Sequence, residues 1–265
     1  MKLLARIFGW LHRAATAAGV LGIGSAFRVF VLARFGGGEQ VLRLPGGHRF
    51  HFRPANDRGV VSHFYSLGYR IQDTPDEPIR TILDGGANIG DETTRFLLHH
   101  PTAEVTAVEP EGSNFELLRK NVDHLDRTLC VHGGLWPVKT HLEVIPGNSQ
   151  EGFRVVETTK TDGTVAAFTI PELMERRGWD SIDVLKLDIE GSEFELFSRG
   201  TEDWLDRVKV LIFEVPDNDR PGSTQKIYEA LGERRFDTFH CGEDLVLIRS
   251  DSPWKLRKVV GLEHR

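Results

Sequence analysis

The stretch from Thr81 to Gly90, Thr-Ile-Leu-Asp-Gly-Gly-Ala-Asn-Ile-Gly, constrains the fold of this chain more than any other. Its apolar start is typical of the end of a buried strand, and its glycines allow a tight turn and a close approach to a ligand. Residues 91–99 follow with a helical pattern that Pro101 ends. The sequence therefore predicts a strand, a glycine-rich turn and a helix whose free N–H groups face the turn.

The residues of this turn argue against a dinucleotide site. A dinucleotide-binding turn reads G-x-G-x-x-G, whereas here Asp84 directly precedes Gly85 in the sequence D-G-G-A-N-I-G. A carboxylate at this place would repel a pyrophosphate, and it suits a ligand with an ammonium group, such as S-adenosylmethionine. An ordinary strand-to-helix turn without a ligand is the simpler alternative.

A second acid, Glu109, follows the next β-rich segment, residues 104–108, and lies 25 residues after Asp84. An acid about 20 residues on, at the end of the second strand of a βαβ unit, is where a ribose diol is held. A solvated acid at a strand end is the alternative. Pro110 ends the strand, and Ser113 with Glu116 predicts a capping box for a helix that continues to about residue 125.

Three segments of this region resemble the FkbM family of methyltransferases: Asp84 to Gly90, Val108-Glu109-Pro110, and residues 114–121. Leu185 to Glu193, Leu-Lys-Leu-Asp-Ile-Glu-Gly-Ser-Glu, resembles that family's second signature. The resemblance covers about residues 80–250. It implies an α/β fold of class I, a Rossmann-like sheet with helices on both faces and a C-terminal antiparallel hairpin. It also implies methyl transfer from S-adenosylmethionine, usually to oxygen, on varied small molecules and glycans.

The resemblance and the pattern together select the residues that we expect to hold the cofactor. By the resemblance, the adenine lies near the end of the third strand, close to Leu135 and Trp136; core packing is the alternative for Trp136. The cofactor-binding candidates are Asp84, Gly85, Gly86, Ala87, Asn88, Gly90, Glu109, Pro110, Asn114, Leu135, Trp136 and Asp188.

Further acids follow two later apolar segments, which predict strands at residues 182–187 and 208–213. Ligands bind at the carboxyl ends of parallel strands, so Asp188, Glu190 and Glu214 are the catalytic candidates. A hydroxyl acceptor needs a general base, for which His132 is a further candidate. We expect Asp188 and Glu190 to share one face if the strand geometry continues. Alternatively, Glu190 caps the helix that begins near Ser192.

These acids could also hold a divalent cation through their oxygens. We expect no obligatory metal.

The chain divides into four predicted parts: a basic amphipathic helical extension (1–38), a hairpin with a helix at 57–69 (39–80), the catalytic core (81–250) and a tail (251–265). Gly36-Gly37-Gly38 marks the first boundary. The extension carries five Lys or Arg residues and no acid, so it could lie on an acidic membrane surface. We favour instead packing against the core or at an oligomer interface. Its apolar run is too short for a transmembrane helix.

Composition excludes some partners. Residues 39–265 hold 28 basic and 39 acidic residues, a net charge of −11, which should repel nucleic acid. Only two cysteines occur, which fits a cytoplasmic protein. The rival functions are an NAD(P)-binding oxidoreductase and a non-catalytic nucleotide-binding module. The acceptor stays open between a small-molecule and a glycan hydroxyl, and a homo-oligomer is among the options.

Overall fold

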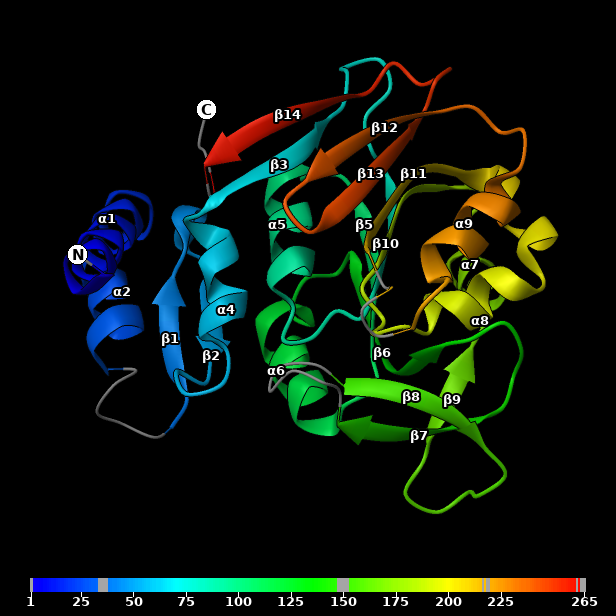
Figure 1. The fold of residues 1–265 in the computed structure, drawn as a ribbon, viewed down its shortest axis with the longest axis horizontal. Helices are drawn as coiled ribbons and strands as arrows, with labels where there is room; N and C mark the ends of the chain where they lie inside the picture. The colour runs from blue at the N-terminus through cyan, green and yellow to red at the C-terminus, as the bar shows by residue number, and fades with distance from the viewer. Residues whose placement is uncertain are drawn as a thin grey trace. The chain divides into compact units, whose positions relative to one another are not determined.

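The computed structural model describes residues 2–32, 38–146, 153–215, 217, 220–260 and 262. The chain forms two compact units, Met1–Arg70 with Arg257–Arg265 and Ile71–Leu256. The division falls within β3 (Leu67–Gln72) and β14 (Lys255–Val260), which pair in a two-stranded sheet (Figure 1). The boundary expected at residues 36–38 falls mostly outside the described residues.

The N-terminal unit begins with α1 (Lys2–Leu21) and α2 (Ile23–Phe27), followed by a further helical turn, Arg28–Leu32. The expected hairpin is confirmed as the antiparallel pair β1 (Gln40–Arg43) and β2 (Arg49–Phe52). None of the helices in the described part of the chain is long and apolar enough to span a bilayer.

Two expectations about the segments that join the units are wrong. The helix predicted at 57–69 is only α4 (Arg58–Val61) with a short turn to Phe64, and β3 follows. Residues 251–265, expected as a tail, contain the strand that pairs with β3. The two strands start at residues 67 and 255, far apart in the chain, so no local pattern could indicate this pairing.

The second unit is built on a ten-stranded sheet, in which β11, β10, β4, β5, β6 and β9 are parallel neighbours. The expected closing hairpin is confirmed as β12 and β13, which join the sheet antiparallel to β11. The strands are β4 (Thr81–Gly85), β5 (Glu104–Glu109), β6 (Thr128–Leu135), β7 (His141–Pro146), β8 (Phe153–Thr158), β9 (Val165–Phe168), β10 (Ile182–Leu187), β11 (Val208–Glu214), β12 (Phe236–Cys241) and β13 (Asp244–Arg249).

Helices cover both faces of this sheet, which confirms the predicted fold class (Figure 1). The helices are α5 (Asp91–His99), α6 (Gly112–Val122), α7 (Ile170–Arg177), α8 (Glu193–Ser198) and α9 (Ser223–Leu231). Leu173 of α7, Leu196 of α8 and Ile227 of α9 share one apolar core with Leu185 and Leu211 of the sheet. Because β10 is covered on both faces, all six of its residues are buried, as its nearly continuous apolar sequence predicts.

Asp183 ties together the starts of three neighbouring strands. Its Oδ2 accepts hydrogen bonds from the backbone N–H groups of Arg80 (2.7 Å) and Thr81 (3.2 Å). Its Oδ1 lies 2.9 Å from Nζ of Lys209, on β11. The carboxylate is nearly buried, so these donors have no other acceptor of comparable strength.

We expect Asp183→Ala to lower the free energy of unfolding by about 2–4 kcal/mol, because two part-buried backbone N–H groups and Lys209 lose their charged acceptor. Urea denaturation followed by circular dichroism measures this loss. Asp180→Ala, which removes an exposed carboxylate three residues away, is the control and should change stability little. Equal stability of the two variants would contradict the role of Asp183.

Candidate functional site

The glycine-rich turn after β4 is held against the end of β5 and against the loop that follows β10. The backbone N–H groups of Gly86 and Ala87 both donate to the carbonyl oxygen of Val108, at 3.0 Å. The N–H of Asp188 donates to the carbonyl of Gly85, also at 3.0 Å. Gly86 has φ +75°, and a Cβ there would overlap the carbonyl oxygen of Asp188. Only glycine fits this contact.

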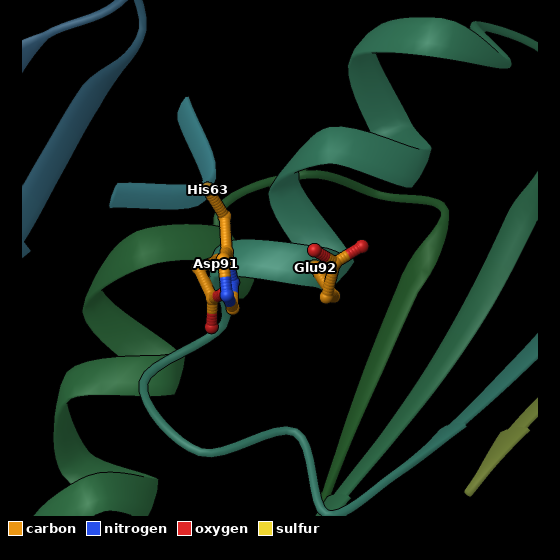
Figure 2. A group of neighbouring side chains, drawn as sticks. All are labelled: His63, Asp91 and Glu92. Atoms are coloured by element: carbon orange, nitrogen blue, oxygen red, sulfur yellow. The ribbon is translucent and has the colours of Figure 1, made fainter. Parts of the chain in front are cut away.

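The turn leads into α5, whose first turn carries Asp91 and Glu92 (Figure 2). His63, which is also labelled there, belongs to the N-terminal unit. Further along the same helix, Oγ1 of Thr93 donates to Oδ2 of Asp84 at 2.5 Å. Asp84 is completely buried, and this burial raises the pKa of its carboxyl to about 6.

Lys186 is the residue of the site that sequence reasoning missed. Its buried ammonium lies 3.7 Å from Oδ1 of Asp84 and 3.3 Å from Oδ2 of Asp188. Burial disfavours its charge, but the carboxylates of Asp188 and Asp84 outweigh this effect and raise the pKa of the ammonium. A lone lysine inside an apolar strand was the available signal, because a buried lysine is rarely without a partner.

Glu109, the last residue of β5, is the next acid of the site. Its Oε2 accepts from the N–H of Asn88 (2.9 Å) and its Oε1 accepts from the N–H of Glu111 (2.8 Å). Burial raises the pKa of this carboxyl to about 7, against the opposing effect of these hydrogen bonds. Asn88 has φ +48°, an uncommon conformation outside glycine, in which asparagine is tolerated better than most residues.

The start of α6 differs from the expected capping box. The cap is Glu111, whose Oε2 accepts from the N–H of Asn114 and from Oγ of Ser113, both at 2.7 Å. The helix ends at Val122, three residues earlier than predicted. Asn114 is buried at its first turn.

The loop after β10 does not continue the strand, so the expected alternation of Asp188 and Glu190 is wrong. Glu190 has φ +54°, which turns the backbone away from extended geometry. The capping alternative considered for Glu190 applies instead to Glu193, whose carboxylate accepts from the N–H groups of Ile189 and Gly191, both at 2.9 Å. Burial raises the pKa of Glu193 to about 7.

A cavity of about 530 Å³, solvent-open space included, lies at the carboxyl ends of these strands. Eight of the predicted site residues line it: Gly86, Asn88, Glu109, Pro110, Asn114, Leu135, Asp188 and Glu190.

The other candidates support the cavity or lie beside it. Asp84 joins the turn to α5 through the hydrogen bond from Thr93. A Cβ at Gly85 would overlap the side chain of Leu135. A Cβ at Gly90 would come within 2.8 Å of Leu118 on α6. Among the described residues, Ala87 is likewise buried without lining the cavity.

Trp136 is outside the lining among the described residues, and it packs with Leu142, Val155 and Ala167. Trp136 directly follows the last residue of β6 and belongs to this small apolar cluster, which is the core-packing alternative considered for it. Phe153 and Val155, both on β8, also line the cavity, as do Val108, Gly133, Gly134 and Ile189. Sequence reasoning missed the two β8 residues because only the fold of the β7–β9 region brings β8 to this place.

Two candidate bases have different surroundings. Glu214 is half-buried at the end of β11, and its burial, with the nearby carboxylates of Asp188 and Glu243, raises its pKa to about 8. The ring of His132 stacks on Phe115, with centroids 4.7 Å apart, and its Nε2 lies 3.2 Å from the carbonyl oxygen of Pro110. Neither residue is in the described lining, and the contacts of His132 hold its ring against α6.

A protein-family model covers the part of the chain that forms this site. The model of the methyltransferase FkbM domain matches residues 84–238, from the acid before the glycine turn to the closing hairpin. The chain belongs to the FkbM methyltransferase family. The FkbM domain thus includes all the loops that line the cavity.

Two relatives and two solved structures illustrate this similarity. This chain is 22% identical over 162 residues to 2-O-methyltransferase NoeI of Sinorhizobium fredii, and the match covers 54% of this chain and 66% of the relative. It is 26% identical over 208 residues to methyltransferase sdnD of Sordaria araneosa, covering 64% and 77%. A methyltransferase FkbM from Methylobacillus flagellatus has a TM-score of 0.47 at 15% identity, covering 64% of this chain and 43% of that one. A putative caffeoyl-CoA O-methyltransferase from Staphylococcus aureus has a TM-score of 0.40 at 12% identity, covering 65% and 77%. The match therefore spans just under two thirds of NoeI and less than half of the Methylobacillus chain.

We expect Gly86→Ala to lower the free energy of unfolding by about 2–4 kcal/mol, because it adds a clash to the cost of a positive φ. Gly163→Ala is the matched control, since Gly163 has φ +71° but no atom within 4 Å of a Cβ. Thermal and urea unfolding of both variants separate the two costs. If both variants lose the same stability, the close contact with Asp188 contributes nothing.

Proposed function

We propose that this chain is a cytoplasmic, S-adenosylmethionine-dependent methyltransferase that acts on a hydroxyl group of a small molecule or glycan. The observation that carries this proposal is the cavity in which Asn88, Glu109 and Asp188 meet at the ends of three parallel strands. The printed name of one relative, a 2-O-methyltransferase, supports oxygen as the accepting atom. The low number of cysteines supports a reducing compartment.

The residues present fit S-adenosylmethionine better than a phosphate-bearing cofactor. Glu109, Asp188 and Glu190 give the cavity a negative lining, which attracts an ammonium or sulfonium and repels a pyrophosphate. Gly86 lines the cavity without a side chain, so a ligand can approach its main-chain atoms closely. The bound cofactor would supply an electrophilic methyl group.

Each acid then has a distinct role in this proposal. Glu109 accepts a backbone N–H through each oxygen and a further hydrogen bond from the side chain of Asn114, and its remaining lone pair accepts from a ribose hydroxyl. Asp188, oriented by Lys186, faces the cofactor's positive charge. Glu214, whose pKa is about 8, is suited to exchange a proton near neutral pH, close to Asp188 and Glu190.

The cofactor is tested by calorimetric titration with S-adenosylmethionine, S-adenosylhomocysteine and NAD. We expect the first two to bind and NAD to give no heat of binding. The acceptor is then sought by incubating the protein with cell extracts and a methyl-labelled donor, followed by mass analysis of labelled products. Binding of NAD alone would contradict the proposal and favour an oxidoreductase.

We expect Glu109→Gln to weaken S-adenosylhomocysteine binding by about 1.5–3 kcal/mol, because it removes a charged acceptor. Since the pKa of Glu109 is about 7, the wild-type carboxyl is protonated below that pH and ionised above it. The ionised form accepts ribose hydroxyls better, so wild-type affinity should rise from about pH 6 to about pH 8, and the variant should lack this rise. Calorimetry across this range measures both effects.

The control is Glu116→Gln, an exposed residue of α6, which should keep the wild-type affinity and its pH dependence. A folded Glu109→Gln variant that keeps wild-type affinity at every pH removes Glu109 from the ribose site.

Asp188→Asn should reduce methyl transfer to the acceptor found in the screen by about a hundredfold, the range for loss of a catalytic carboxylate. The melting temperature should change little, because the Asp188 side chain is 40% exposed and asparagine still offers an oxygen to Lys186. Asp162→Asn, in an exposed loop, is the control. Full activity of Asp188→Asn would show that this carboxylate is dispensable for catalysis.

A further inference from the structure

Exposed apolar side chains are concentrated at the start of the chain. Of six exposed large apolar residues in the described part of the protein, three lie on α1 and α2: Leu11 (49% exposed), Ile23 (82%) and Phe27 (51%). The other three are spread singly over β8, α9 and β12, and isolated exposed apolar residues are normal on a protein surface. An apolar group on one short segment marks an interaction surface.

The exposed residues follow a regular spacing. Leu11, Ala15, Gly19, Ile23 and Phe27 recur every fourth residue, and each is exposed. Within α1 this spacing places Leu11, Ala15 and Gly19 along one side of the helix, and no polar side chain interrupts the series. Ile23 and Phe27 keep the same spacing in α2, which begins after the non-helical Gly22 (φ +81°). We call these five residues the outer stripe.

A second apolar face of the same segment is already used for packing. Ala17, Leu21 and Val29 are buried, and so is Ser25, whose Oγ lies 3.4 Å from the backbone N of Arg43 on β1. This face of the N-terminal extension therefore packs within its own unit, and the packing expected against the catalytic core or at an oligomer interface stays a prediction. This buried face does not contain the outer stripe.

The charge around the outer stripe has a single sign. Residues 1–38 carry five basic residues and no acid, whereas the remainder of the chain has a net charge of −11. Arg13 is exposed, and Arg28 directly follows Phe27. Basic side chains beside exposed Leu, Ile and Phe match the headgroups and the hydrocarbon edge of an anionic bilayer.

We propose that the outer stripe binds the surface of an anionic lipid bilayer. A second copy of the chain fits this surface less well. Pairing of the same stripe from two copies would bring the two basic segments together. The acidic unit offers opposite charge, but its exposed apolar residues in the described part are isolated, so it has no apolar surface to match.

The test is flotation of the full-length chain with vesicles of phosphatidylcholine, with and without phosphatidylglycerol. We expect binding to the anionic vesicles, little binding to pure phosphatidylcholine, and weaker binding as salt screens the charges. Replacing Ile23→Ser and Phe27→Ser together should weaken apparent vesicle affinity at least about tenfold, since it removes the inserted apolar groups. Arg13→Glu should weaken it by about the same factor, because it reverses a charge near the headgroups.

Matched variants on the acidic unit serve as controls. Tyr228→Ser removes an exposed apolar residue of α9, and Lys160→Glu reverses an exposed charge beside β8. Both should bind vesicles like the wild type, and all variants should keep the wild-type circular dichroism spectrum. The proposal is wrong if the wild type does not float with anionic vesicles at low salt, or if the controls lose as much binding as the outer-stripe variants. It is also wrong if ultracentrifugation shows self-association that depends on Ile23 and Phe27 while vesicles bind nothing.

Discussion

The buried ammonium of Lys186, held between the carboxylates of Asp84 and Asp188, is the interaction on which the arrangement of the cavity depends. It joins the end of β4 to the loop after β10, beside the contact between Gly86 and the carbonyl of Asp188. Removing the ammonium of Lys186 would leave the fully buried carboxylate of Asp84 without its partner, which costs roughly 3–5 kcal/mol. The same pairing orients Asp188, whose side chain is 40% exposed and lines the cavity.

Two other buried acids accept hydrogen bonds from backbone N–H groups. Glu109 and Glu193 each accept two backbone N–H groups and so hold the loops after β4, β5 and β10. Burial raises both pKa values to about 7, above the ordinary value for a glutamate. At a pH between the ordinary glutamate pKa and about 7, the folded protein therefore binds more protons than the unfolded chain. The contribution of these two acids to stability falls as the pH rises toward 7. A ligand that donates to Glu109 would offset part of this loss.

The two units differ in charge as well as in architecture. The overall charge of −6 combines a basic N-terminal segment with an acidic remainder. In the second unit, acids are concentrated at the carboxyl ends of the strands, where they give the cavity its negative lining. In the first unit, the exposed Ile23 and Phe27 lie in a segment without any acid. The negative cavity is therefore suited to a cationic small molecule, and the basic N-terminal segment matches the anionic bilayer that we propose as its partner.

The amino-acid sequence by itself determined the order of strands and helices around the site, because those signals are local. The apolar run before Asp84, the glycine turn, the helix at 91–99 and the closing hairpin each follow from neighbouring residues, and so does the placing of Glu109 and Asp188 at strand ends. Only the tertiary structure decided that Lys186 pairs with Asp84, that Glu193 rather than Glu190 caps the loop, and that Trp136 packs in a small apolar cluster. It also brought β8 to the cavity and paired β3 with β14. These features depend on packing, on local backbone geometry and on contacts between residues far apart in the chain, which hydrophobic periodicity does not encode.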